Sequence, residues 1–333
     1  MWQDITKGEI MSIESKIVAE SEKDIRLDRW FKRHYPDISH GMLEKWLRKK
    51  NIRVDGKKAL SNMRLKVGQI IHVPQIETTK SPIKVKNISK ADTTFIQKMV
   101  LYKDDDLIIL NKPAGLAVQG GSKTIRHIDG MLDALKFEYD EKPHLVHRLD
   151  KETSGILVVA RTVQSAAVLS QLFKTKKIHK TYWALVAGVP RPTKGRIEAP
   201  LAQRRTGKNS DQRTVDRDGI VAVSLYQMQD HLADKVSWLQ MSPLTGRTHQ
   251  LRIHAAEVLK TPILGDERYG ERTETTKDLP NKMFLHARAI SIPLSNKKFL
   301  TVEAPLPEHF RMAFQQFGFS EKNVKPVFSR SLK

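Results

Sequence analysis

A nine-residue segment, residues 147–155, carries closely spaced charged side chains between two apolar runs. The runs comprise residues 145–146 and 156–160, and both are typical of buried strands. Asp150 therefore belongs to a loop that joins two strands, where a carboxylate is unlikely to be part of a core. Arg148 and Lys151 flank it and favour its ionised form, which can act as a nucleophile or a base. A tight turn capped by Asp150 explains the segment equally well when it is taken alone.

The net charge of the chain points to a polyanionic partner. Its 333 residues include 58 Lys and Arg against 37 Asp and Glu, which gives +21. Nucleic acid is the first candidate, because phosphate neutralisation supplies much of its binding energy. An acidic membrane surface is the second, but no basic amphipathic helix with a clean apolar face is evident. A charge that only keeps the protein in solution is the remaining interpretation.

The composition also excludes several classes of site. The chain has no cysteine, so disulfides, thiolate zinc sites and thiol nucleophiles are ruled out. No apolar run approaches the roughly 20 residues that are needed to cross a bilayer. The first residues lack the apolar stretch of a secretory signal, and Asp4 and Glu9 make them too acidic for a simple mitochondrial presequence. We therefore expect a cytoplasmic protein without a membrane-spanning segment.

Hydrophobic periodicity divides the chain into a small first domain and a larger second one. Residues 1–23 are polar and aperiodic, and we expect them to form a flexible tail. Residues 24–75 predict two helices followed by a hairpin whose turn is Asp55-Gly56. The other segments are a flexible linker over residues 76–95, a strand-rich domain over residues 96–320 and a basic tail over residues 321–333.

Basic side chains crowd around one helix–strand junction of the first domain, and this pattern predicts RNA binding. The residues are Arg29, Lys45, Arg48, Lys49 and Arg53. The domain resembles the S4 RNA-binding module through residues 26–30, 43–48, 52–56 and 65–70. A structural domain with a merely solvated charged face is the alternative.

The second domain carries three further motifs. Asn111-Lys112-Pro113-Ala114-Gly115 follows an expected strand over residues 107–110, and Lys180-Thr181-Tyr182 opens another. The third motif, residues 244–254, reads L-T-G-R-T-H-Q-L-R-I-H. Gly246 would end a strand and Thr248 could start a helix, so Arg247 would lie at a strand–helix junction.

Together with residues 147–155, these motifs resemble those of the large-subunit ribosomal RNA pseudouridine synthase family. The shared patterns are H-R-L-D-x-x-T-S-G, N-K-P-x-G, K-x-Y and T-G-R-T-H-Q-L-R-x-H. Gly120-Gly121-Ser122 also resembles a loop of the C-type branch of these enzymes. The resemblance covers about residues 24–315 and includes the S4-like module.

This resemblance implies an α+β fold, in which a mixed, mostly antiparallel sheet carries an RNA cleft. It implies isomerisation of uridine to pseudouridine in RNA, with large-subunit ribosomal RNA as the expected partner and no cofactor or metal. Asp150 would be the catalytic carboxylate, Tyr182 would pack against the target base, and Arg247 would pair with Asp150 and orient it. Because the target base must leave its stack, Arg148 would fill the vacated gap or hold a phosphate.

Other kinds of site fit the sequence less well. His249 and His254 are five residues apart and lack an acidic third ligand, so we expect no zinc site. A nucleophile elbow of the form G-x-S-x-G is absent. Residues 115–120 imitate a phosphate loop, but Gly121 stands where that loop needs lysine. Two functional alternatives remain, which are the same reaction on transfer RNA and a non-catalytic RNA-binding or ribosome-assembly protein. We expect a monomer.

Overall fold

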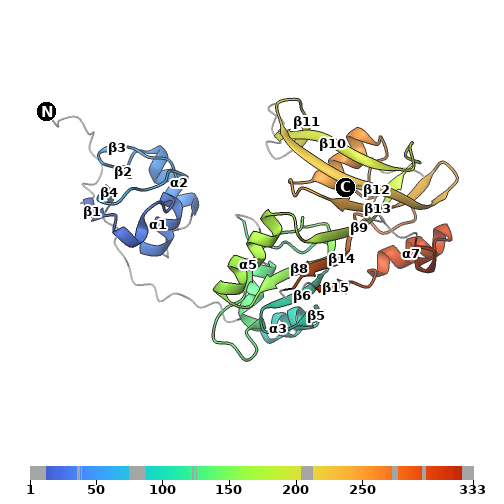
Figure 1. Ribbon diagram of the computed structural model, residues 1–333, viewed down its shortest axis with the longest axis horizontal. Helices are drawn as coiled ribbons and strands as arrows, with labels where there is room; N and C mark the ends of the chain where they lie inside the picture. Colours follow the sequence, from blue (N-terminus) through green and yellow to red (C-terminus); the bar gives the residue numbers. More distant parts are fainter. Residues whose placement is uncertain are drawn as a thin grey trace. The chain divides into compact units, whose positions relative to one another are not determined.

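The computed structural model describes residues 13–35, 38, 40–74, 88–121, 124, 126–203, 213–271, 277–294 and 298–324. The chain separates into two compact units, residues 1–87 and 88–333 (Figure 1). The buried hydrophobic residues of each unit form clusters of their own.

The first unit packs two helices against a small sheet. Its strands are β1 (Ile13–Ile17), β2 (Arg53–Val54), β3 (Lys57–Lys58) and β4 (Ile70–Pro74), in the order β1-β4-β2-β3. Its helices are the short η1 (Glu20–Glu22), α1 (Leu27–His34) and α2 (His40–Arg48). Leu27, Trp30 and Phe31 lie at helical spacing, and all three are buried in the core. The two predicted helices are thus present.

The predicted tight hairpin is also present. Asp55 and Gly56 both have positive φ, 49° and 71°, as a two-residue hairpin turn with the right-handed strand twist requires. The Asp55 carboxylate accepts hydrogen bonds from the Ile70 backbone N–H and from the Gln69 side chain, each at 2.8 Å. The turn is therefore tied to β4.

The expectation of a flexible tail over residues 1–23 is wrong for its last part. Strand β1 pairs antiparallel with β4, from Ile13 opposite Pro74 to Ile17 opposite Ile70. Glu22 is buried and accepts a 2.9 Å hydrogen bond from the Trp30 indole. A five-residue strand among polar residues gives too weak a periodicity to be recognised from sequence. Residues 1–12 lie outside the described residues.

The second unit begins earlier than expected. Residues 76–87 of the proposed linker lie outside the described residues, but residues 88–95 belong to this unit. Helix α3 (Lys90–Gln97) is capped at its N-terminus by Ser89, whose hydroxyl accepts a 3.0 Å hydrogen bond from the Asp92 N–H. Ile96 of this helix is buried in the core. At the other end, Glu321–Asn323 forms a short helix and Val324 packs on the core, so the expected tail from residue 321 is ordered up to Val324.

An 11-stranded, mixed and mostly antiparallel sheet forms the centre of this unit, as predicted. The path runs β11-β10-β12-β13-β9-β14-β8-β6-β5, while β15 pairs with β14 and β7 with β8. Only the β14–β8 pairing is parallel among those described. The strands are β5 (Val100–Lys103), β6 (Leu107–Lys112), β7 (His144–Leu145), β8 (Ser154–Ala160), β9 (His179–Ala187), β10 (Lys194–Gln203), β11 (Arg213–Val215), β12 (Ile220–Leu232), β13 (Val236–Pro243), β14 (Leu285–Pro293) and β15 (Phe299–Glu303).

Helices cover the sheet over two separate cores. They are α4 (Ile128–Met131), η2 (Leu132–Leu135), α5 (Val163–Lys174), α6 (Gln250–Ile253), the π-helical η3 (His254–Val258), α7 (Glu308–Phe317) and η5 (Glu321–Asn323). One core contains α7, whose Phe314 ring lies 4.8 Å from that of Trp238 on β13. The other joins β6 and β8 to α3, α4 and α5. Helix α4 is only four residues long and continues in 3-10 geometry from Leu132.

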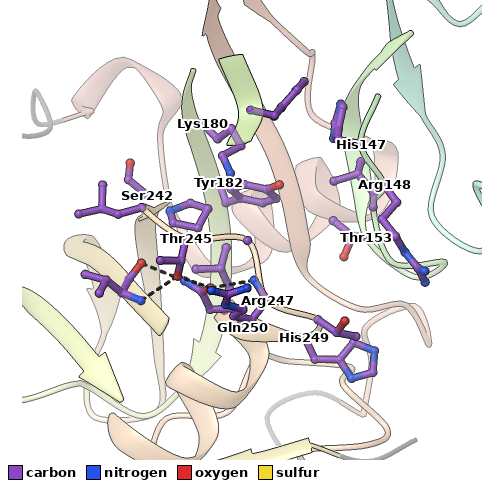
Figure 2. Close-up of a pocket in the computed structure, with 18 of the residues that line it drawn as sticks. His147, Arg148, Thr153, Lys180, Tyr182, Ser242, Thr245, Arg247, His249 and Gln250 are labelled. Carbon is purple, nitrogen blue, oxygen red and sulfur yellow. Dashed lines mark hydrogen bonds between the residues drawn. The ribbon is translucent and has the colours of Figure 1, made fainter. Parts of the chain in front are cut away.

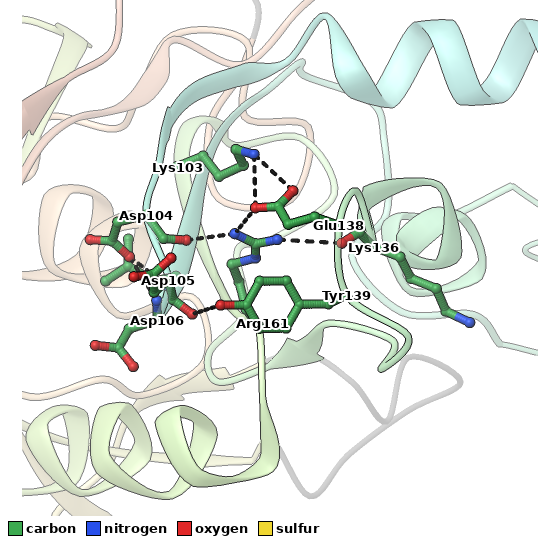
Figure 3. A network of polar contacts seen from close by, with 9 residues as sticks. Lys103, Asp104, Asp105, Asp106, Lys136, Glu138, Tyr139 and Arg161 are labelled. Atoms are coloured by element: carbon green, nitrogen blue, oxygen red, sulfur yellow. Dashed lines mark hydrogen bonds and ion pairs between the residues drawn. The ribbon is translucent and has the colours of Figure 1, made fainter.

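A buried arginine fixes the end of β8 that is remote from Asp150 (Figure 3). Arg161 is 1% exposed and donates 2.8 Å hydrogen bonds to the Asp104 carbonyl and to Glu138. Its guanidinium lies 3.9 Å from the ring centre of Tyr139. The hydrogen bond from Arg161 lowers the pKa of Glu138 to about 2. The contacts tie the β5–β6 turn to the segment that follows η2.

Candidate active site

The loop that carries Asp150 joins β7 to β8, as the sequence predicts. At its end Gly155 has a φ of 103°, and a Cβ there would collide with the Ala287 carbonyl of β14. Only glycine therefore fits where β8 and β14 meet in parallel. Next to it, the Ser154 hydroxyl and the buried His286 imidazole lie 2.8 Å apart. The loop thus ends on a rigid part of the sheet.

The part of the loop directly after Asp150 is held by Lys112 from the N-K-P-x-G segment. Lys112 is fully buried, and its ammonium donates to the carbonyls of Pro113, Leu116 and Lys151 at 2.8–3.0 Å. Burial lowers the pKa of Lys112 to about 7, with the charges of Glu152 and Asp150 opposing that shift. Three carbonyl oxygens around the nitrogen match the three donors of the ammonium form. Lys112 therefore fixes the backbone beside Asp150.

A cavity of about 940 Å³ opens beside Asp150. Figure 2 shows residues that line it, among them Arg148, Tyr182 and Arg247. Asp150 is the one carboxylate among its described lining residues. Seven Lys and Arg side chains also line it, which are Arg148, Lys174, Lys176, Lys180, Arg196, Arg247 and Arg252. The cavity therefore suits an anionic ligand, with a single acidic group for chemistry. Asp150, Tyr182, Arg247 and Arg148 were predicted from three separate motifs, and all four line this one cavity.

The predicted ion pair between Arg247 and Asp150 is wrong. Arg247 is exposed, and its backbone N–H donates to the Gln250 side chain at 3.0 Å. The arginine beside Asp150 is Arg252, whose Nη1 lies 3.6 Å from Oδ2 of the carboxylate. Helix α6 begins at Gln250 rather than Thr248, and this start puts Arg252 on its buried side. The spacing of the motif alone did not reveal which arginine would face the loop.

Asp266 holds Arg252 in place. The Nε and Nη2 atoms of Arg252 donate to the two oxygens of Asp266 at 2.7 Å each. Asp266 also accepts hydrogen bonds from the backbone N–H groups of Arg268 and Tyr269. Burial alone would lower the pKa of Arg252, but the hydrogen bonds and charge of Asp266, together with Asp150, raise it. Arg252 is therefore a fixed positive charge beside Asp150.

Tyr182 stands on β9 and lines the same cavity, where its ring is half-buried (Figure 2). Burial raises the pKa of its hydroxyl, and the charge of Asp150 adds to the shift. The phenol is therefore neutral at physiological pH. An aromatic face in a cation-lined cavity can support a nucleobase without reading its identity.

Comparison with known proteins identifies the family. The family model described as RNA pseudouridylate synthase matches residues 106–257. A Rickettsia felis protein named ribosomal large subunit pseudouridine synthase C is 36% identical over 301 residues, which cover 87% of this chain and 95% of that protein. The chain belongs to the RNA pseudouridylate synthase family. It is a pseudouridine synthase.

Two further pseudouridine synthases show how widely the similarity extends. An Arabidopsis thaliana protein named RNA pseudouridine synthase 4, mitochondrial, is 32% identical, with 86% of this chain and 78% of that protein covered. The solved structure of human RNA pseudouridylate synthase domain containing 4 has a TM-score of 0.59 and 28% identity, over 68% of this chain and 95% of that one.

Several residues of the pseudouridine synthase site were missed by the sequence reasoning. Both Arg252 and His249 lie within the recognised motif of residues 244–254, but no role was predicted for Arg252 and no catalytic or positioning role for His249. Asp266 and Tyr269 belong to the segment G-D-x-x-Y-G at residues 265–270, which also contacts the site. A pairing between residues 14 positions apart across a loop leaves no periodic signal that could have revealed it.

The described residues hold no cluster of acidic or histidine side chains with metal-ligand geometry. His249 faces the cavity, whereas His254 is buried with its Nδ1 3.0 Å from the Ser224 hydroxyl. Over the same part of the chain, no helix is long and apolar enough to span a membrane. Ser122, part of the C-type resemblance, lies outside the described residues.

The basic residues predicted in the first unit are all on its surface. They are Arg29, Lys45, Arg48, Lys49 and Arg53. Lys45 and Arg48 lie on α2, and Lys49 directly follows it. Arg53 on β2 donates to the backbone carbonyls of Lys50 and Gly56, at 3.4 and 3.2 Å. The α2–β2 junction therefore presents several cations to solvent.

Proposed function

We propose that this pseudouridine synthase modifies uridines of large-subunit ribosomal RNA, with Asp150 as the catalytic carboxylate. The observation that carries the assignment of Asp150 is its position as the one carboxylate of a cation-lined cavity, 3.6 Å from Arg252. The ribosomal substrate is supported by the name of the Rickettsia felis relative, which is similar over most of both chains.

The reaction is an isomerisation in which atoms and electrons balance within the substrate. The bond from C1′ of the ribose to N1 of uracil breaks, and a bond from C1′ to C5 forms. C5 loses its proton and N1 gains one, so no oxidant or reductant is consumed. Asp150 acts on the target nucleotide to help detach the base. The ion pair with Arg252 orients the carboxylate for this step.

The target base must leave its stack to reach Asp150. Tyr182 then supports one face of the base, while Arg148 at the mouth of the cavity occupies the vacated place or holds a phosphate. Arg247 is exposed on the lining and has no carboxylate partner among the described residues, so we assign it to the RNA backbone. The basic residues of the S4-like unit bind a separate part of the RNA through its phosphates.

Pseudouridine mapping tests the substrate. RNA from cells with and without the gene is compared, and the purified enzyme is then given ribosomal and transfer RNA separately. We expect pseudouridines to be missing from large-subunit ribosomal RNA without the gene, and the enzyme to restore them. Sites that disappear only from transfer RNA would overturn the ribosomal assignment. Asp150→Asn serves as the inactive control.

A further inference from the structure

His249 combines three features that the proposed chemistry has not used. Its imidazole is largely buried at the cavity wall, 13% exposed, with Nε2 3.8 Å from Oδ2 of Asp150. Its Nδ1 lies 2.9 Å from the Tyr269 hydroxyl. Its backbone has a φ of 57°, in the left-handed region, at the residue before α6. A histidine held in a strained conformation beside a reactive carboxylate indicates a functional constraint.

The hydrogen bonds around Tyr269 decide which ring nitrogen carries the proton. The Tyr269 oxygen accepts the backbone N–H of Arg213 at 3.3 Å. Its own proton is then free to be donated to Nδ1 of His249. The opposite arrangement would give the phenol two donors and leave its own proton without an acceptor among the described residues. Within this part of the chain, every one of these groups is satisfied when Nδ1 accepts and the proton of His249 is on Nε2.

The Nε2–H bond therefore faces Asp150. Burial lowers the pKa of His249, with Asp150 opposing the shift and Arg252 adding to it. The ring is accordingly a neutral donor, not a second cation. Arg252 and His249 both approach Oδ2 of Asp150, at 3.6 and 3.8 Å. Neither contact involves Oδ1 of Asp150.

We propose that His249 is a positioning residue for Asp150, held by Tyr269 in the tautomer that carries its proton on Nε2. This inference rests on the proposed role of Asp150. Arg252 supplies the charge at Oδ2, and His249 supplies a directed neutral donor that fixes the rotation of the carboxylate. The 3.8 Å separation shortens to a hydrogen bond when the substrate closes the cavity, as contacts of catalytic groups commonly do. The left-handed backbone of His249 is what turns its ring toward the loop.

Two substitutions at residue 249 separate the contact with Asp150 from the contact with Tyr269. In His249→Asn, the short amide can accept from Tyr269 but cannot reach Asp150, and asparagine tolerates the left-handed backbone. In His249→Gln, the longer amide places an N–H donor near the position of Nε2. We expect the single-turnover rate to fall about 10- to 100-fold in His249→Asn. We expect it to stay within about fivefold of wild type in His249→Gln, and RNA affinity to be unchanged in both.

The tautomer is measured directly by nuclear magnetic resonance on protein labelled with ¹⁵N-histidine, where the His249→Asn spectrum identifies the signal. We expect an unprotonated Nδ1 and a protonated Nε2 in the wild type, and a mixed tautomer in Tyr269→Phe with a rate about three- to tenfold lower. The control, His231→Asn, changes an exposed histidine outside the cavity, and its rate should match the wild type.

Two results would overturn the inference. One is a wild-type signal with the proton on Nδ1, and the other is a folded His249→Asn variant with a rate within twofold of wild type. The kinetic substrate is whichever RNA the wild type modifies, so an error in the ribosomal assignment does not affect this test. Activity that survives in Asp150→Asn would instead contradict the proposed function. The tautomer measurement does not depend on that result.

Discussion

The guanidinium of Arg252 forms a bidentate pair with Asp266, in which both N–O distances are 2.7 Å. The pair is almost completely buried, with side-chain exposures of 9% and 1%. Only Nη1 of Arg252 remains to face Asp150. The orientation of the candidate catalytic carboxylate thus depends on a residue that follows it by 116 positions in the sequence.

Replacing Arg252 by Met should therefore impair stability as well as catalysis. The change leaves the Asp266 carboxylate buried without its partner, and such a loss costs about 3–5 kcal/mol. Urea unfolding measures this loss of unfolding free energy. Arg247→Met is the matched control, because that side chain is exposed and should change stability by less than about 1 kcal/mol. Equal destabilisation by the two variants would contradict the assignment of Arg252.

Replacing Lys112 by Met should loosen the Asp150 loop. The variant leaves three carbonyl oxygens without their donor, including that of Lys151, and unsatisfied buried acceptors cost about 1–3 kcal/mol each. Hydrogen exchange should quicken at the amides of residues 150–153, and turnover should fall. Exchange rates identical to the wild type there would show that Lys112 does not hold the loop.

Stability should fall as the pH is lowered from 6.5. Burial lowers the pKa of His286 to about 3, and the pKa values of His254 and His309 to about 4. Between pH 4 and 6.5 the unfolded chain binds protons that the folded chain does not, so the free energy of unfolding rises with pH in this window. Each histidine contributes up to about 1.4 kcal/mol per pH unit.

The variant His286→Asn isolates one of these contributions. Its unfolding free energy should depend less steeply on pH between 4 and 6.5, whatever its absolute stability. Urea titrations at several pH values give both slopes. If the slope of the variant equals that of the wild type, His286 does not remain neutral in the folded protein.

The S4-like unit should bind RNA phosphates. Changing Lys45, Arg48 and Lys49 to Gln should weaken RNA binding and reduce the slope of log affinity against log salt by about 0.7–0.9 for each phosphate that is no longer neutralised. The control removes the same charge from the second unit, at exposed Arg217, Lys235 and Arg311. An affinity that is unchanged across salt concentrations would mean that the α2–β2 cations are only solvated.

The sequence was most informative where a short motif and a strong local pattern coincided. The Asp150 loop and the Asp55-Gly56 turn were both predicted in the right places, because turn chemistry and apolar periodicity are local. The mixed, mostly antiparallel sheet came from family resemblance rather than periodicity.

What could not be predicted depends on tertiary contacts. Arg247 and Arg252 are five residues apart in one motif, and Arg252 faces Asp150 because helix α6 begins at Gln250, directly after the left-handed residue His249. Strand β1 is recognisable only through its pairing with β4, more than 50 residues later. The orientation of Arg252 and the pairing of β1 both depend on packing between segments that are distant in the sequence. Such packing leaves no local hydrophobic periodicity from which it could be predicted.

The most direct test of the account is turnover by Asp150→Asn. The substitution keeps the shape of the side chain and removes its charge, while the cations of the cavity are untouched. We predict a folded variant that binds RNA with nearly wild-type affinity and forms no detectable pseudouridine in a single-turnover assay. A folded variant that retains a tenth or more of the wild-type turnover would contradict the assignment of Asp150 as the catalytic carboxylate.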